Sequence, residues 1–241
     1  MTPATHNPAP QAGGHSRRHP LVHAVRSHST GHYFWLFASL LLYMVIEPLL
    51  DFPMHIQVTS VLVILAAVRT ARDGILGRWG TVALAGVYAT AATLAVITGT
   101  HWLVAAAAAL FGALMLSVAI DGLAYVVGRS KIQADHIFAA ICVYLAMSFL
   151  FAAAYWTIWV FDPSAFAGSG LSDDPHPREM GYFSFMILTT TGLGDILPAS
   201  RLTRLLATLE ALCGTLYLAL MIARLVGMYA QQGRGPDETG G

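Results

Sequence analysis

Residues 182–198 read YFSFMILTTTGLGDILP, and this stretch decides the fold. It begins as an apolar, aromatic-rich segment and changes at Thr189 into a polar run that contains Gly192 and Gly194, one residue apart. Two glycines so close together weaken a helix and permit backbone angles that other residues avoid. We therefore expect a helix over 180–189 that gives way to an extended loop.

The position of this loop in the chain makes it informative. It lies between two long apolar segments, 134–161 and 202–230, each of which is long enough to cross a bilayer. Irregular backbone persists at membrane depth only where it is buried in protein or lines a water-filled path, because lipid offers no partner to its polar groups. A polar loop that returns to this depth with its carbonyls turned inward is an ion site.

The run from Thr189 to Asp195, TTTGLGD, resembles the signature of the potassium channel family, usually written T-T-V-G-Y-G-D. In that family the pore module consists of an outer helix, a pore helix, a filter and an inner helix, and the resemblance covers the chain from residue 132 onwards. It implies a homotetramer in which four copies of the loop surround a central pore.

The resemblance also assigns the filter. Its five positions fall on Thr190, Thr191, Gly192, Leu193 and Gly194. Carbonyl oxygens of the first four would replace the hydration shell of a potassium ion, and the Thr190 hydroxyl would add a further oxygen. Potassium is then the permeant ion, and no cofactor is implied.

Two filter positions depart from the usual pattern of the family. Thr191 stands where valine is usual, which is a nearly isosteric change. Leu193 stands where tyrosine is usual, and it lacks the ring and hydroxyl that help to brace the filter from behind. Two alternatives to a potassium-selective channel therefore stay open: a weakly selective cation channel, and a non-conducting membrane subunit that retains the loop.

The resemblance places support for the filter on Tyr182, Thr189, Asp195 and Glu210. Tyr182 aligns with a position that often hydrogen-bonds the aspartate after the filter, here Asp195. We expect Glu210 to lie behind the filter and to bond to the pore helix rather than to ions. Gly214 aligns with the hinge glycine of the inner helix, and a packing glycine is the alternative.

The composition is that of an integral membrane protein. Hydrophobic residues make up 56% of the chain and charged residues 11%, against roughly 25% charged residues in soluble domains. The formal net charge of zero gives no case for a nucleic-acid partner. The expected partners are further copies of the chain, as the resemblance implies, and membrane lipids. Cys142 and Cys213 lie within apolar segments, where we interpret them as small buried hydrophobes. No Ser-His-Asp set, HExxH motif or phosphate-binding loop appears, so an enzyme is not expected.

Six apolar segments predict an all-α integral membrane protein with six transmembrane helices, a re-entrant pore helix and a filter loop. They run over 33–50, 52–68, 79–98, 102–127, 134–161 and 202–230. The second is short for a span, which needs about 20 residues.

Basic residues orient these segments. Arginines precede the first segment, and Arg or Lys lies in the second and fourth links, whereas the first and third links carry neither. By the positive-inside rule, both termini face the cytoplasm. The scarcity of lysine beside arginine favours the plasma membrane of a prokaryote, its inner membrane.

The chain divides into four parts. These are a disordered, His-rich cytoplasmic tail (1–32), a four-helix accessory domain (33–131), the pore domain (132–230) and a short disordered tail (231–241). A voltage sensor would carry arginines at every third position, but the segment 102–127 has no Arg or Lys. We therefore do not expect strong voltage gating.

Overall fold

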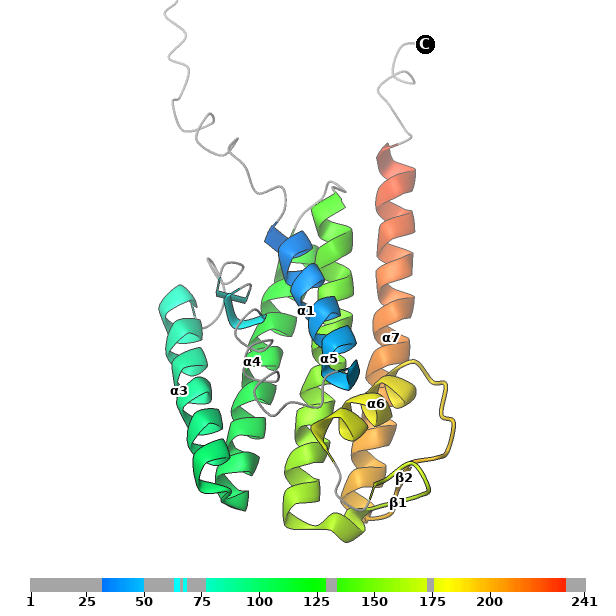
Figure 1. Ribbon diagram of the computed structural model, residues 1–241. Helices are drawn as coiled ribbons and strands as arrows, with labels where there is room; N and C mark the ends of the chain where they lie inside the picture. The colour runs from blue at the N-terminus through cyan, green and yellow to red at the C-terminus, as the bar shows by residue number, and fades with distance from the viewer. Residues whose placement is uncertain are drawn as a thin grey trace, which may run out of the picture. The chain divides into compact units, whose positions relative to one another are not determined.

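Long apolar helices account for most of the described chain (Figure 1). The computed structural model describes residues 32–49, 63–65, 67–68, 77–128, 134–172 and 176–232. The helices are α1 (His32–Leu49), α3 (Gly77–Thr98), α4 (His101–Val127), α5 (Ala134–Phe161), α6 (Pro177–Leu188) and α7 (Arg201–Gln232). The shorter elements are the turn η2 (Pro163–Ala165) and the strands β1 (Phe166–Ala167) and β2 (Leu197–Pro198).

Four of these helices are long and apolar enough to cross a membrane. The candidate spans are Gly77–Thr98, His101–Val127, Asp135–Phe161 and Arg201–Arg224. Helix α1 contains a shorter apolar stretch, Tyr33–Ile46. The chain is therefore a mostly helical, multi-pass membrane protein, as the sequence predicts.

Several predictions concern residues outside the described ranges. The predicted segment 52–68 lies mostly there, and so do the tails 1–31 and 233–241. Most of the basic residues that orient the segments are in the same gaps. The count of six spans, the orientation of the termini and the nature of both tails therefore stay predictions.

Helix α5 is the element on which the others pack. It contacts α1, α4, α6 and α7, while α3 packs against α4. Two glycines of α4 bring it close to α5: a Cβ atom at Gly122 would lie 2.6 Å from Val143 Cγ2, and one at Gly112 would lie 3.3 Å from Ala153 Cβ. Small residues allow such close approach between helices in lipid.

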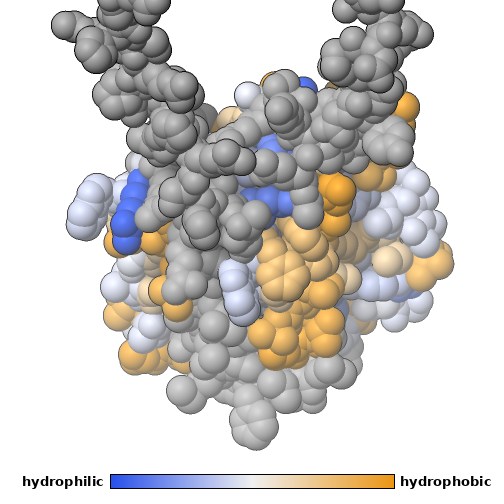
Figure 2. Space-filling model, turned by 90° about the horizontal axis from the view of Figure 1, so that it is seen from above, coloured by the Kyte–Doolittle hydropathy of each residue, from blue (hydrophilic) through white to orange (hydrophobic). Residues whose placement is uncertain are grey.

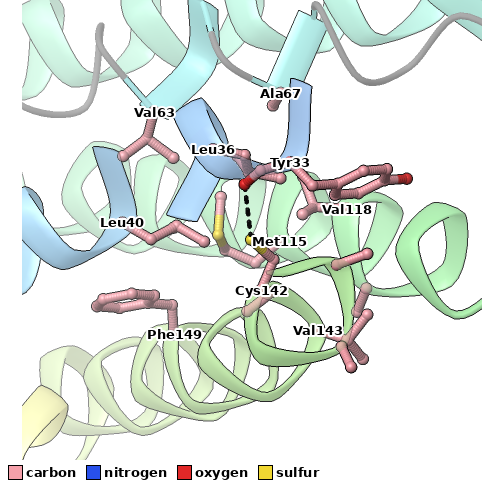
Figure 3. Close-up of a cluster of buried hydrophobic side chains, with 14 of the residues drawn as sticks. Tyr33, Leu36, Leu40, Val63, Ala67, Met115, Val118, Cys142, Val143 and Phe149 are labelled. Carbon is pink, nitrogen blue, oxygen red and sulfur yellow. Dashed lines mark hydrogen bonds between the residues drawn. The ribbon is translucent and has the colours of Figure 1, made fainter. Parts of the chain in front are cut away.

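Apolar side chains of α1, α4 and α5 fill the space between these helices (Figure 3). Leu36 and Met115 are fully buried there, and Cys142 Sγ donates to the Tyr33 carbonyl at 3.5 Å. The prediction of a buried Cys142 is confirmed, but the same prediction for Cys213 is wrong, because that residue is exposed on α7. An apolar helix in a membrane can face lipid or a neighbouring subunit, so apolar surroundings in sequence do not require burial in the same chain.

Much apolar surface is exposed on the single chain. On α7, the exposed large hydrophobic residues are Leu202, Leu205, Leu209, Leu212, Leu216, Leu218, Leu220, Ile222 and Val226. Figure 2 looks onto the end of the molecule where α7 ends, and hydrophobic residues reach the surface there beside hydrophilic ones. Such a surface suits contact with lipid or with further copies of the chain.

The link between α5 and α6 pairs with the segment that leads into α7. Strands β1 and β2 are antiparallel, with Phe166 opposite Pro198 and Ala167 opposite Leu197. Helix α6 lies between α5 and α7 in the chain and contacts both. The pairing therefore attaches the chain on both sides of α6 to one small sheet, which limits where α6 and the loop after it can lie.

Candidate functional site

Helix α6 leads into the polar loop. It begins at Pro177, because proline fits the first turn of a helix, and it ends at Leu188. The predicted bounds, 180–189, are therefore wrong at both ends, by more at the start. The first turn contains Pro177 and Glu179, which are helix-start residues rather than apolar ones, so apolar content alone places the start too late.

Backbone hydrogen bonds turn the loop back onto the end of α6. The Met186 carbonyl accepts from the amides of Thr191 (2.9 Å) and Gly192 (3.1 Å). The Phe185 carbonyl accepts from the amide of Thr189 (3.0 Å) and from its Oγ1 (2.6 Å). These bonds satisfy carbonyls that the last turn of a helix leaves open, and they hold the loop amides against the helix.

Every second residue of the loop has a left-handed backbone. The φ angle is 57° at Thr190, 51° at Gly192 and 79° at Gly194. Glycine adopts such angles freely, whereas a β-branched residue there costs about 1–3 kcal/mol. The sequence predicts the unusual angles at the two glycines but not at Thr190, although extending the two-residue period backwards from Gly192 would have found it.

The loop presents acceptor oxygens without donors. Among the described residues, no hydrogen bond ends on the carbonyl oxygens of 190–194. The Thr190 hydroxyl donates to the Thr189 carbonyl at 2.7 Å, so its own oxygen still has free lone pairs. The residues from Thr189 to Gly194 are all exposed on the single chain, and Leu193 is 67% exposed. Carbonyl and hydroxyl oxygens in this state are suited to a cation.

An open groove of about 450 Å³ lies between the loop and α7. Thr190 and Gly192 line one side of it, and Thr208 and Ala211 line the other. Arg204 Nε, at the start of α7, donates to the Pro198 carbonyl at 3.1 Å. Hydrogen bonds to α6 therefore hold the loop on one side, and its other side is open towards this groove.

The residue after the loop is held from two sides. The Tyr182 hydroxyl donates to Asp195 Oδ2 at 2.8 Å, as the resemblance implied, and this bond raises the pKa of Tyr182. The Gly170 amide donates to the Asp195 carbonyl at 2.9 Å. A Cβ atom at Gly168, where φ is 133°, would lie 2.0 Å from that carbonyl oxygen, so only glycine fits. Sequence reasoning missed both glycines, because nothing near them in the chain shows that the loop lies against them.

A fully buried polar cluster joins the three helices around the loop. Glu210 of α7 is 0% exposed, and its Oε2 accepts from the Tyr155 hydroxyl of α5 at 2.7 Å. Its Oε1 accepts from the Ser184 hydroxyl of α6, and the Ser184 and Ser148 hydroxyls are 3.1 Å apart. Glu210 thus bonds to α6, as predicted, while Tyr155, Ser184 and Ser148 were not singled out. The available signal was the presence of hydroxyl groups within apolar segments.

Gly214 of α7, the predicted hinge glycine, lies against the end of α6. A Cβ atom there would lie 2.6 Å from the Leu188 carbonyl oxygen. The same oxygen accepts from the Tyr144 hydroxyl of α5 at 3.1 Å. This geometry supports the alternative of a packing glycine, while the role as a hinge stays a prediction.

Residues 136–231 match the family model described as "Ion channel". The match starts at the beginning of α5 and ends at the end of α7, so it contains α6, the loop and the buried polar cluster. These residues are therefore similar to an ion-channel domain, and the resemblance to potassium channels is consistent with that similarity. No curated protein and no solved structure matches the chain.

Proposed function

We propose that the chain forms a homotetrameric potassium channel in which each subunit contributes residues 190–194 to one filter. The observation that carries the proposal is the loop at the end of α6, with alternating left-handed residues and carbonyl oxygens that accept no bond. Alternation of this kind lets successive carbonyls point the same way, which a ring of ligands around a dehydrated ion requires.

In this proposal α6 is the pore helix. Its carbonyl end leads into the filter, where the negative end of the helix dipole favours a cation. Tyr182, Thr189, Asp195 and Glu210 support the filter, and potassium binds at Thr190, Thr191, Gly192 and Leu193. Support comes from the hydrogen bonds of Tyr182 and Glu210, which tie the loop and α6 to their neighbours.

The remaining chain provides the membrane setting. We propose an accessory domain (33–131), a pore domain (132–230), cytoplasmic termini and a prokaryotic inner-membrane location. Helix α4 carries no Arg or Lys, which supports conduction without strong voltage gating. The exposed apolar face of α7 supports contact with further copies of the chain.

A weakly selective cation channel is the second candidate. Leu193 favours it, because this side chain is 67% exposed and has no hydroxyl to bond to the surrounding protein. A filter with less bracing can adjust to ions of different radius, which reduces the difference between potassium and sodium.

Currents through the purified protein in planar bilayers test both candidates. With opposing potassium and sodium gradients, a selective channel reverses near the potassium equilibrium potential, whereas a reversal near zero would favour the weakly selective channel. Gly192→Asp should abolish the current, and Gly227→Asp is the matched control because it lies in α7 beyond the candidate span. Assembled wild-type protein without current would instead favour the non-conducting subunit.

A further inference from the structure

A cavity of about 280 Å³ lies beside the first half of α6. Its walls come from α1, α3, α4, α5 and α6. The residues that shape it include Tyr43, Tyr88, Phe111, Trp156, Pro177 and Gly181. It is separate from the loop, since no residue from 189–194 lines it.

The cavity exists because small side chains meet there. Alanines of α3, α4 and α5 line much of its wall, and Gly181 leaves open space on α6. A Cβ atom added at Gly181 would meet nothing within 4 Å. Packing in a protein interior normally fills such a volume with side chains, so a cavity of this size has room for an occupant.

The chemistry of the lining selects the occupant. No Lys, Arg, Asp or Glu lines the cavity, and its surface is almost entirely apolar. Water is disfavoured in such a space, because it needs polar partners. Three of the walls belong to candidate membrane spans, so the medium next to the cavity is the hydrocarbon of the bilayer.

We propose that this cavity binds one acyl chain of a membrane lipid. The volume is slightly below the roughly 300–1,000 Å³ of typical small-molecule pockets, which suits a single hydrocarbon chain better than a whole lipid with its headgroup. The bound chain would contact α6 at Pro177 and Gly181, on the helix that leads into the polar loop. The inference goes beyond ion conduction and does not depend on it.

Tryptophan fluorescence tests the proposal, because Trp156 lines the cavity. In a variant that keeps only this tryptophan, with Phe at the other four tryptophan positions, the full chain is placed in vesicles of phosphatidylcholine with brominated or unbrominated acyl chains. Bromine quenches tryptophan only at contact. We expect brominated chains to quench Trp156 strongly.

Two occluding variants and one control decide the outcome. Gly181→Leu and Ala92→Leu place extra carbons in the cavity from α6 and α3 and should remove most of the quenching. Gly86→Leu is the matched control: a Cβ atom there also meets nothing within 4 Å, but the residue does not line the cavity, so quenching should persist. Quenching that stays at the Gly86→Leu level in both occluding variants would overturn the proposal, as would the absence of quenching in the parent variant.

Discussion

The two sides of α5 pack against their neighbours in different ways. Towards α1 and α4 the contacts are mainly apolar, with Gly122 set against the Val143 side chain, and the hydrogen bonds there are long: 3.3 Å from the Tyr125 hydroxyl to Asp135 and 3.5 Å from Cys142 to the Tyr33 carbonyl. Towards α6 and α7 they include buried hydrogen bonds, from Tyr155 to Glu210 and from Tyr144 to the Leu188 carbonyl. Apolar contacts tolerate small shifts, whereas a buried polar group that loses its partner carries the full cost of desolvation. We infer that the accessory side can adjust its packing, while the side that holds the loop has one defined geometry.

Removal of the Glu210 carboxylate should have the largest effect on stability. Glu210→Ala leaves the buried Tyr155 hydroxyl without its acceptor, whereas the Ser184 hydroxyl keeps the Ser148 carbonyl at 2.8 Å. The unpaired hydroxyl, together with the buried space left by the side chain, should cost about 2–4 kcal/mol of unfolding free energy. Thermal unfolding in detergent, followed by circular dichroism, measures the change. Glu210→Gln keeps two polar atoms and should cost less; equal stability of the two variants would contradict the role of the polar cluster.

The next largest effect is expected at Gly214. In Gly214→Ala, the new methyl group would lie 2.6 Å from the Leu188 carbonyl oxygen, a backbone atom that Tyr144 also holds. Overpacking of this kind costs about 1–3 kcal/mol and should displace the end of α6, so both stability and ion flux should fall. Gly227→Ala, where a Cβ atom meets nothing within 4 Å, is the control and should be neutral or slightly stabilising.

Gly122→Ala tests whether the side of α5 that faces α1 and α4 tolerates added volume better than the side that faces α6 and α7. Its new methyl group would also lie 2.6 Å from a neighbour, but that neighbour is the Val143 Cγ2 methyl group rather than backbone. Rotation of the valine and the gain of about 1 kcal/mol in helix propensity should leave stability within about 1 kcal/mol of wild type. A loss as large as that of Gly214→Ala, in the same unfolding measurement, would mean that the apolar side is as inflexible as the polar one.

The smallest effect on stability is expected at Tyr182. Tyr182→Phe removes the bond to Asp195 at a site that water can reach, so folding should be nearly unchanged, while selectivity for potassium over sodium should fall. Reversal potentials measure this.

The hydrogen bond between Tyr182 and Asp195 also predicts how ion selectivity depends on pH, because it shifts the pKa of Tyr182. Because the bond to Asp195 raises the pKa of Tyr182 above its ordinary value of 10, the neutral, donating form persists below that pH and is lost only at higher pH. Selectivity of the wild type should therefore not change between neutral pH and pH 9 through Tyr182. A change there that Tyr182→Phe abolishes would contradict this assignment.

Much of the helical arrangement could be predicted from local sequence. The predicted segment 134–161 coincides with α5, and 79–98 and 102–127 differ little from α3 and α4. These predictions hold because a span needs a continuous apolar run, which is a property of neighbouring residues. A break after Thr189 is predicted for the same kind of reason, since the two glycines act on their own backbone, and the helix ends one residue earlier, at Leu188.

The contacts of the loop could be predicted only in part. The bond between Tyr182 and Asp195 followed from the resemblance, because both residues align with positions of the family's pore helix and filter. The positions of Gly168 and Tyr155 beside Asp195 and Glu210 did not, because each pair is brought together by the folding of separate elements. The apolar content of each segment does not indicate which helix it packs against.

The sequence alone therefore determined that this is a multi-pass membrane protein with a polar, glycine-containing loop between its last two long apolar segments. Hydrophobic length and backbone preference act within a few residues, so they can be read from the chain. Only the tertiary structure decided that the carbonyls of 190–194 accept no bond and that Glu210 lies buried between Tyr155 and Ser184. Such partners come from distant parts of the chain, and they are chosen by packing and by the cost of leaving buried polar groups unpaired.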